Sequence, residues 1–110
     1  MKRLAIFILA PMLATSAVVA VDARLLAKGH AILDQNCSRC HAIGNDGAST
    51  HEKAPPFRNV VTRYAAETLA EALAEGLVSG HPDMPEFTFE PAEIDAIIAY
   101  LDSLGSPAKK

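Results

Sequence analysis

The sequence lacks several features that particular classes of protein require. Among its 110 residues are two cysteines and no tryptophan, and no alternating apolar run is long enough to predict a strand. Its 10 basic residues are outnumbered by 13 acidic ones, so it lacks the basic surface of a nucleic-acid-binding protein. Repeats, low-complexity tracts and interdomain linkers are also missing. These absences favour one small, all-α domain of acidic character.

Both cysteines lie in one motif, Cys37-Ser38-Arg39-Cys40-His41. The C-x-x-C-H pattern is typical of covalent c-type haem attachment. Two thiols at this spacing on a helical turn can reach the two vinyl groups of one haem, and the adjacent histidine can ligate its iron. The alternatives are a thioredoxin-like pair, a structural zinc site and a disulfide. The first needs flanking strands, the second needs further ligands, and the third closes only a short loop.

Residues 1–20 have the features of a secretory signal peptide. Lys2 and Arg3 form its positive start, an apolar stretch follows, and small residues up to Ala20 form a cleavage site. An uncleaved membrane anchor is the alternative, because the apolar run is at the lower length limit for a membrane span. Residues 21–110 are then the folded domain, exported to the bacterial periplasm. Without Lys2 and Arg3 it has 8 basic and 13 acidic residues, a formal charge of −5.

Three amphipathic segments predict the helices of this domain. They span residues 23–36, 65–77 and 91–104, and each carries leucine or isoleucine at helical spacing. The stretches between them, residues 42–62 and 78–90, contain prolines and are expected to be irregular. Loops this long in a small domain are often functional, and wrapping a haem would account for both.

The mature chain has one methionine that could complete an iron site. Met1 and Met12 belong to the predicted signal peptide, whereas Met84 lies in a proline-bounded loop, His81-Pro82-Asp83-Met84-Pro85. Iron held by histidine and methionine is a pattern that raises the reduction potential of haem. A core position is the other role open to Met84, but a proline-bounded loop is a poor place for core packing.

Three histidines compete with Met84 as the distal iron ligand. His30 lies within the first predicted helix and His51 lies in a polar loop, so both are expected at the surface. His81 shares the loop of Met84 and is therefore the alternative ligand.

The chain resembles the class I monohaem cytochromes c of the small bacterial type. The resemblance covers the whole mature part: a helix leading into C-x-x-C-H, a later proline, a methionine in a late loop and a C-terminal helix. Gly29 precedes Cys37 at the family spacing, and Tyr100-Leu101 matches the family's last helix. The resemblance implies an all-α domain that wraps one covalently bound haem c. Its N- and C-terminal helices would cross, with Gly29 allowing them to touch.

The resemblance also implies the residues that hold the haem. Cys37 and Cys40 would form the thioethers, His41 would be the proximal iron ligand and Met84 the distal one. The function implied is that of a one-electron carrier in a periplasmic electron-transfer chain.

Three further positions follow the family spacing. Pro55 would accept a hydrogen bond from His41, Phe57 would contact the haem, and Arg63 would bind a haem propionate or else be a plain surface residue. The chain departs from the family where Ala54 replaces the glycine before the proline, and where the propionate-binding tryptophan of mitochondrial members is missing. The lysine-rich rim of those members is also absent, so their partners are not carried over.

With both axial positions filled, no iron site remains for a substrate, so the chain is not expected to be an enzyme. Its partners would be a redox donor and a redox acceptor. One alternative is a haem subunit of a membrane-associated dehydrogenase or oxidase. Another is a haem sensor or peroxidase-like protein, which would follow if Met84 did not ligate the iron.

Overall fold

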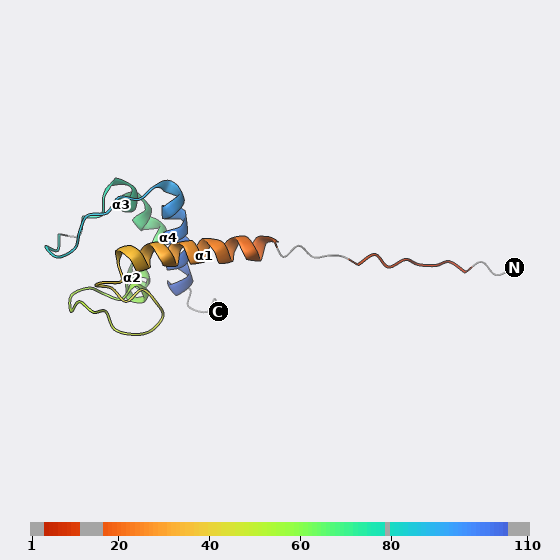
Figure 1. The fold of residues 1–110 in the computed structure, drawn as a ribbon, viewed down its shortest axis with the longest axis horizontal. Coiled ribbons are helices and arrows are strands. Elements are labelled where there is room, and N and C mark those ends of the chain that lie inside the picture. Colours follow the sequence, from red (N-terminus) through yellow and green to blue (C-terminus); the bar gives the residue numbers. More distant parts are fainter. Residues whose placement is uncertain (1–3, 12–16, 79, 106–110) are drawn as a thin grey trace.

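All regular secondary structure described in this chain is helical (Figure 1). The structure is a computed structural model that describes residues 4–11, 17–78 and 80–105. Its elements are α1 (Ala17–Asn36), α2 (Phe57–Arg63), the 3₁₀ helix η1 (Ala66–Leu69), α3 (Ala70–Glu75) and α4 (Pro91–Gly105). No strand occurs within the described residues, and the all-α prediction is confirmed.

Helices α1 and α4 cross at the centre of the domain, and the other helical elements pack around them (Figure 1). The core contains hydrophobic side chains only, with no buried polar residue among the described ones. Its members are Ile32, Leu33, Ala66, Leu73, Ile94, Ala96, Ile97 and Leu101. Most of them come from α1 and α4, so the predicted contact between the terminal helices is confirmed.

The start of α4 follows from local signals in the sequence. Pro91 is its first residue, where a missing backbone N–H has no helical partner to lose. The carboxylate of Glu93 accepts a hydrogen bond from the backbone N–H of Glu90 at 2.9 Å, which is one half of a capping box. Ile94 and Ile97 then turn their side chains into the core.

Gly29 is a point of close approach between α1 and α4. A Cβ atom at residue 29 would collide with the backbone carbonyl oxygen of Ala96 and would lie 2.8 Å from the Cβ of Tyr100. A backbone carbonyl cannot rotate away, so the two helices pack this closely because residue 29 has no side chain. The expectation that Gly29 lets the terminal helices touch is confirmed.

Replacing Gly29 by alanine is therefore expected to destabilise the fold. Overpacking of a tight interface costs about 1–3 kcal/mol, and it outweighs the roughly 1 kcal/mol that alanine contributes through helix propensity. The free energy of unfolding in urea is the measurement. Gly44→Ala is the matched control, because no atom lies within 4 Å of a Cβ at that position. Equal stability of the two variants would contradict the close approach.

Helix α2 corrects the prediction that residues 42–62 are irregular throughout. It is only seven residues long, contains Val60, Val61 and Thr62 in succession, and has no buried residue. Such a segment lacks the periodic apolar face that identifies a helix in a sequence. The Cγ2 atom of Val61 lies 2.8 Å from where a Cβ of Gly105 would be, so α2 packs closely on the end of α4. Tertiary packing of this kind supports helices too short to be stable alone.

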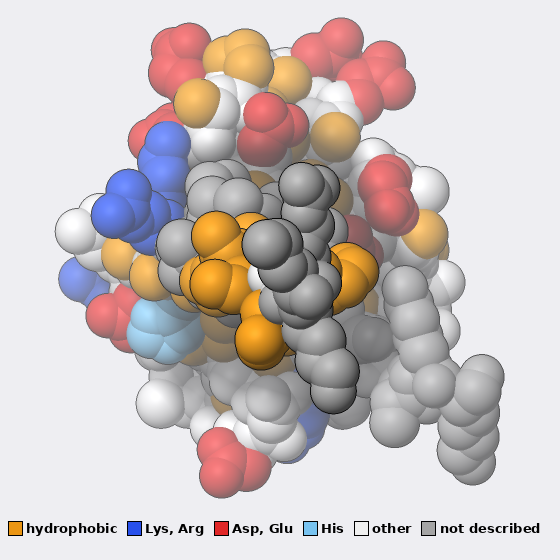
Figure 2. Space-filling view, turned by 90° about the vertical axis from the view of Figure 1, so that its right-hand side faces the viewer, with side chains coloured by type: hydrophobic (Ala, Val, Ile, Leu, Met, Phe, Trp, Pro, Cys, Tyr) orange, Lys and Arg blue, Asp and Glu red, His pale blue; other side chains and the backbone are white. Residues whose placement is uncertain are grey.

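The other predicted helices occur with changed limits. Helix α1 begins at Ala17 rather than at residue 23. The segment 65–77 forms η1 and then α3, which ends at Glu75. Gly76 follows with a φ of 117°, a value that side-chain-bearing residues rarely adopt. Three glutamates of η1 and α3 are exposed, namely Glu67, Glu71 and Glu75. Figure 2 shows several acidic side chains over the upper part of the view.

The N-terminal segment lies apart from the helical domain (Figure 1). Within residues 4–11 five large hydrophobic side chains are 82% to 92% exposed, namely Leu4, Ile6, Phe7, Ile8 and Leu9. Residues 1–3 and 12–16 of the predicted signal peptide lie outside the described residues, and residues 17–20 begin α1. In the described part of the chain, no helix has both the length and the apolar character to cross a membrane.

Candidate functional site

The C-x-x-C-H motif forms a tight turn directly after α1. The backbone N–H of Cys37 donates to the carbonyl of Leu33 at 2.8 Å, which continues the last turn of the helix. The N–H groups of Cys40 and His41 both donate to the carbonyl of Cys37, at 3.1 and 2.9 Å. Two thiols and one imidazole are thereby held on a single turn of backbone, as attachment of one haem requires.

Both cysteines are free thiols and both are half-buried. Cys37 packs against the hydrophobic core, and this burial, with a smaller effect from Cys40, raises the pKa of the Cys37 thiol to about 11. Cys37 is therefore protonated at neutral pH, unlike the low-pKa thiolate of a thioredoxin-like pair. The described residues also contain no group of three His, Cys, Asp or Glu side chains that could hold a metal ion, as a zinc site would.

His41 is held in one orientation by two neighbours. Its Nδ1 donates a hydrogen bond to the carbonyl oxygen of Pro55 at 2.7 Å. A carbonyl only accepts, so the proton of the neutral imidazole lies on Nδ1 and the lone pair of Nε2 is left for a metal. The ring also stacks on Phe57, with 4.8 Å between ring centroids and 29° between planes. Pro55 and Phe57, both singled out in the sequence, therefore lie against His41.

The loop from His41 to Pro56 is tied to the helices by several hydrogen bonds. The backbone N–H of Phe57 donates to the carbonyl of Ala42 at 2.9 Å, which closes the base of the loop. From α4, the Tyr100 hydroxyl donates to the carbonyl of Ile43 at 2.7 Å, and burial raises the pKa of that hydroxyl. This link between α4 and the loop was not predicted, because a tyrosine position carries no sign of a partner 57 residues away.

Helix α2 carries two arginines, Arg58 and Arg63. The family spacing selects Arg63, but Arg58 is the one that contacts the rest of the protein. Arg63 is exposed on the last turn of the helix. Arg58 instead donates from Nη2 to the carbonyl of Gly47 at 2.6 Å, and its Nη1 is a buried nitrogen without a hydrogen-bond partner in the described structure. Arg58 thus supports the loop after His41.

Met84 is half-buried in a turn stabilised by its neighbours. Its backbone N–H donates to the carbonyl of His81 at 3.1 Å, and the N–H of Asp83 donates to Nδ1 of His81 at 3.2 Å. His30 is exposed beside Tyr100, as expected. The expectation of a surface position for His51 needs correction, because its side chain is only 30% exposed and contacts Asp83.

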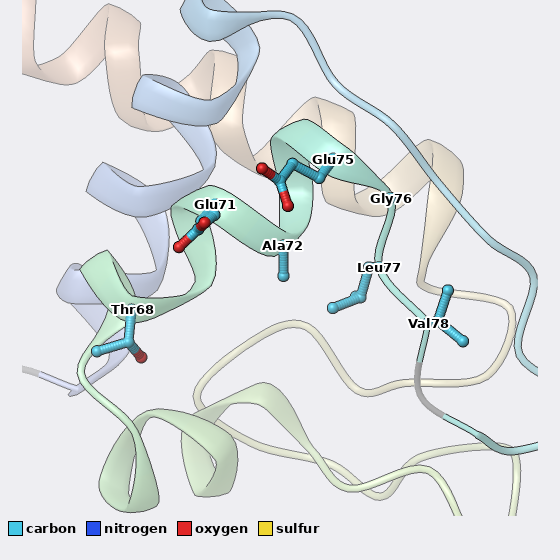
Figure 3. A pocket seen from close by; sticks show the side chains of 7 residues that line it. All are labelled: Thr68, Glu71, Ala72, Glu75, Gly76, Leu77 and Val78. Carbon is cyan, nitrogen blue, oxygen red and sulfur yellow. The ribbon is translucent and has the colours of Figure 1, made fainter.

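The residues after α3 border an open pocket of about 370 Å³ (Figure 3). It is lined by Thr68, Glu71, Ala72, Glu75, Gly76, Leu77 and Val78. Figure 3 shows Ala72 and Leu77 pointing toward the side on which α2 and the loop after His41 lie. Apolar side chains of α3 and of the residues that follow it therefore face the segment that carries the partners of His41.

The residues at the motif fit a covalently bound haem c. The two thiols are free, and Nε2 of His41 has its lone pair available because Nδ1 is engaged by Pro55. Several partly buried apolar side chains pack on the adjoining core, and they include Ile43, Phe57, Leu69, Leu77 and Phe89. Such a lining suits a large, flat, apolar ring with little water around it.

Residues 24–101 match the family model described as cytochrome c oxidase, cbb3-type, subunit III. The match covers 78 of the 110 residues and includes the C-x-x-C-H motif. No curated protein and no solved structure matches the chain. The resemblance to monohaem c-type cytochromes is thereby confirmed, and the chain belongs to the family of cytochrome c domains of subunit III of cbb3-type oxidases, in which a covalent haem c carries electrons.

Proposed function

We propose that this protein is a one-electron carrier of a periplasmic electron-transfer chain, with its haem c ligated by His41 and Met84. The observation that carries the proposal is the geometry of His41. Its imidazole follows the two thiols on one turn, and the Pro55 carbonyl 2.7 Å from Nδ1 leaves Nε2 for iron. In a chain of a cytochrome c family, this arrangement supports a haem site more directly than any other feature of the molecule.

Each residue of the site has one role in this proposal. Cys37 and Cys40 form the thioethers, and His41 is the proximal ligand. Pro55 keeps the proton on Nδ1 of His41, which fixes the orientation of the ring and makes Nε2 a better donor. Phe57 covers the proximal side and keeps water from it. When bound, haem c supplies the one-electron couple between ferric and ferrous iron.

Two further residues complete the site. Met84 provides a thioether sulfur as the distal ligand, and a sulfur ligand favours ferrous iron and raises the potential. Arg63, whose side chain is exposed on the last turn of α2, would bind a propionate. With both axial positions filled by protein, the chain transfers electrons and performs no catalysis of its own.

The family match favours a second candidate function, that of a haem-bearing subunit in an oxidase complex. Its redox partners would then be other centres of that complex rather than diffusing proteins. In either case, the protein works outside the cytoplasm, as c-type cytochromes do. We propose that residues 1–20 direct its export as a signal peptide, or remain as an anchor, and that residues 21–110 form the cytochrome domain.

Absorption spectra of the exported protein, oxidised and then reduced, test the proposal most directly. We expect the sharp reduced bands of a low-spin c-type haem, and in the oxidised protein the weak far-red band that marks a methionine–iron bond. Acid-acetone extraction is expected to leave the haem on the chain. Haem that moves into the solvent would disprove covalent attachment, and a high-spin spectrum would favour the open-site alternative.

A further inference from the structure

The loop that carries Met84 contacts His51, a residue of the loop that follows the C-x-x-C-H motif. Nε2 of His51 lies 3.2 Å from a carboxylate oxygen of Asp83, the residue directly before Met84. The His51 ring also meets the His81 ring edge to face, with 5.4 Å between centroids and 89° between planes. His51 therefore contacts two residues of the turn that ends at Met84, although it lies 32 positions from Asp83.

The backbone of His51 is bonded to the haem-attachment motif itself. Its N–H donates to the carbonyl of Cys40 at 3.1 Å, and its own carbonyl accepts from Ala54 at 3.1 Å. The backbone N–H of Lys53 donates to Nδ1 of the ring at 3.1 Å. Because Nδ1 accepts a hydrogen bond, the ring proton lies on Nε2, which donates to Asp83. The ring is thus held from its own loop and points its donor at the Met84 turn.

Hydrogen bonds within the Met84 turn stabilise it, and the tip of the loop projects from the helices. The residues that follow Met84 are bonded to α3 and to Leu77. The backbone N–H of Leu77 donates to the carbonyl of Phe87 at 3.1 Å, and the N–H of Phe89 donates to the carbonyl of Leu73 at 2.9 Å. Figure 1 shows the loop between α3 and α4 projecting from the same end of the domain as the loop after α1. The contacts of His51 join these two projecting loops.

We propose that His51 is a positioning residue for the distal ligand. Through Asp83 and His81 it links the Met84 turn to the backbone of Cys40, and so holds the thioether sulfur at the iron against displacement. The inference rests on the proposed ligation by Met84. Asp83 is 66% exposed, so the pair contributes little to global stability. The pair disfavours local opening of the loop that carries Met84, and this opening can occur without unfolding of the domain.

Displacement of Met84 by imidazole from the oxidised holoprotein tests this role. The loss of the methionine–iron band reports the displacement as imidazole is added at one fixed pH. An exposed pair of this kind shifts an equilibrium roughly two- to fivefold. We therefore expect His51→Ala to bind imidazole that much more tightly, with covalent haem and thermal unfolding unchanged. Glu52→Ala, an exposed neighbour in the same loop, is the matched control and is expected to behave as the unmodified protein.

Three further variants separate positioning from a general loosening of the loop. Asp83→Ala removes the hydrogen bond but leaves the ring contact of His51 with His81, so its effect is expected to be no larger than that of His51→Ala. The double variant is expected to bind imidazole no more tightly than His51→Ala, because that substitution already removes the pair. His51→Gln keeps an N–H donor and is expected to restore part of the resistance to imidazole. Additive effects, or an affinity unchanged in His51→Ala, would show that His51 does not position Met84. A missing methionine–iron band in the unmodified protein would instead refute the ligation by Met84.

Discussion

Met84→Ala is expected to keep its covalent haem and to have a much lower reduction potential than the unmodified protein. A thioether stabilises ferrous over ferric iron, and each tenfold preference between the two states corresponds to about 59 mV for one electron. We therefore expect the potential to fall by at least ~59 mV. The far-red methionine–iron band is expected to disappear, and the vacated position to accept added cyanide or imidazole. Potentiometric titration with optical detection measures both effects on one sample.

His81→Ala is the matched comparison for this experiment, because His81 lies three positions before Met84 and its backbone carbonyl closes the same turn. This variant is expected to keep the methionine–iron band and a potential close to that of the unmodified protein. The distal position would instead belong to the histidine if the unmodified protein lacked this band, and if the potential changed in His81→Ala but not in Met84→Ala.

The largest effect on haem content and folding is expected from substitution of the two cysteines. Cys37→Ala or Cys40→Ala alone would leave one thioether and should lower the yield of holoprotein. The double variant is expected to carry no covalent haem. The described core contains eight buried residues, few for a small domain, so the folded state of the double variant should also be lost or much weakened. Haem staining after denaturing electrophoresis, with far-ultraviolet circular dichroism, measures both outcomes.

Ser38→Ala controls for disturbance of the motif turn. The Ser38 hydroxyl donates to the backbone carbonyl of Asp34 at 2.5 Å and has no part in the thioether chemistry. Normal haem content in this variant, beside its loss in the cysteine variants, would assign the effect to the thiols. Covalent haem retained by the double variant would mean that attachment occurs elsewhere in the chain.

Features with a local cause could be predicted from the sequence. The helix ending at the C-x-x-C-H motif and the first turn of α4 each depend on residues close in sequence. The contact at Gly29 joins distant residues and was expected from the family resemblance. Family resemblance also pairs the carbonyl of Pro55 with His41, and the two groups lie 2.7 Å apart.

Features with a distant cause were missed. Helix α2 has no periodic apolar face and packs on the end of α4, which lies some 40 residues later. His51 reads as a polar loop residue because its partner is 32 positions away. Arg58 and Arg63 share one short helix, and spacing alone does not show that Arg58 turns inward to Gly47. In each case, a tertiary contact decides what the local sequence leaves open.

The crossing of α1 with α4 has a consequence for how the protein is made. The two helices that build most of the core come from opposite ends of the domain, so the core forms only after the last residues of α4 have been synthesised. The packing of these helices also half-buries both cysteines, so their thiols are more accessible before the domain folds than after it.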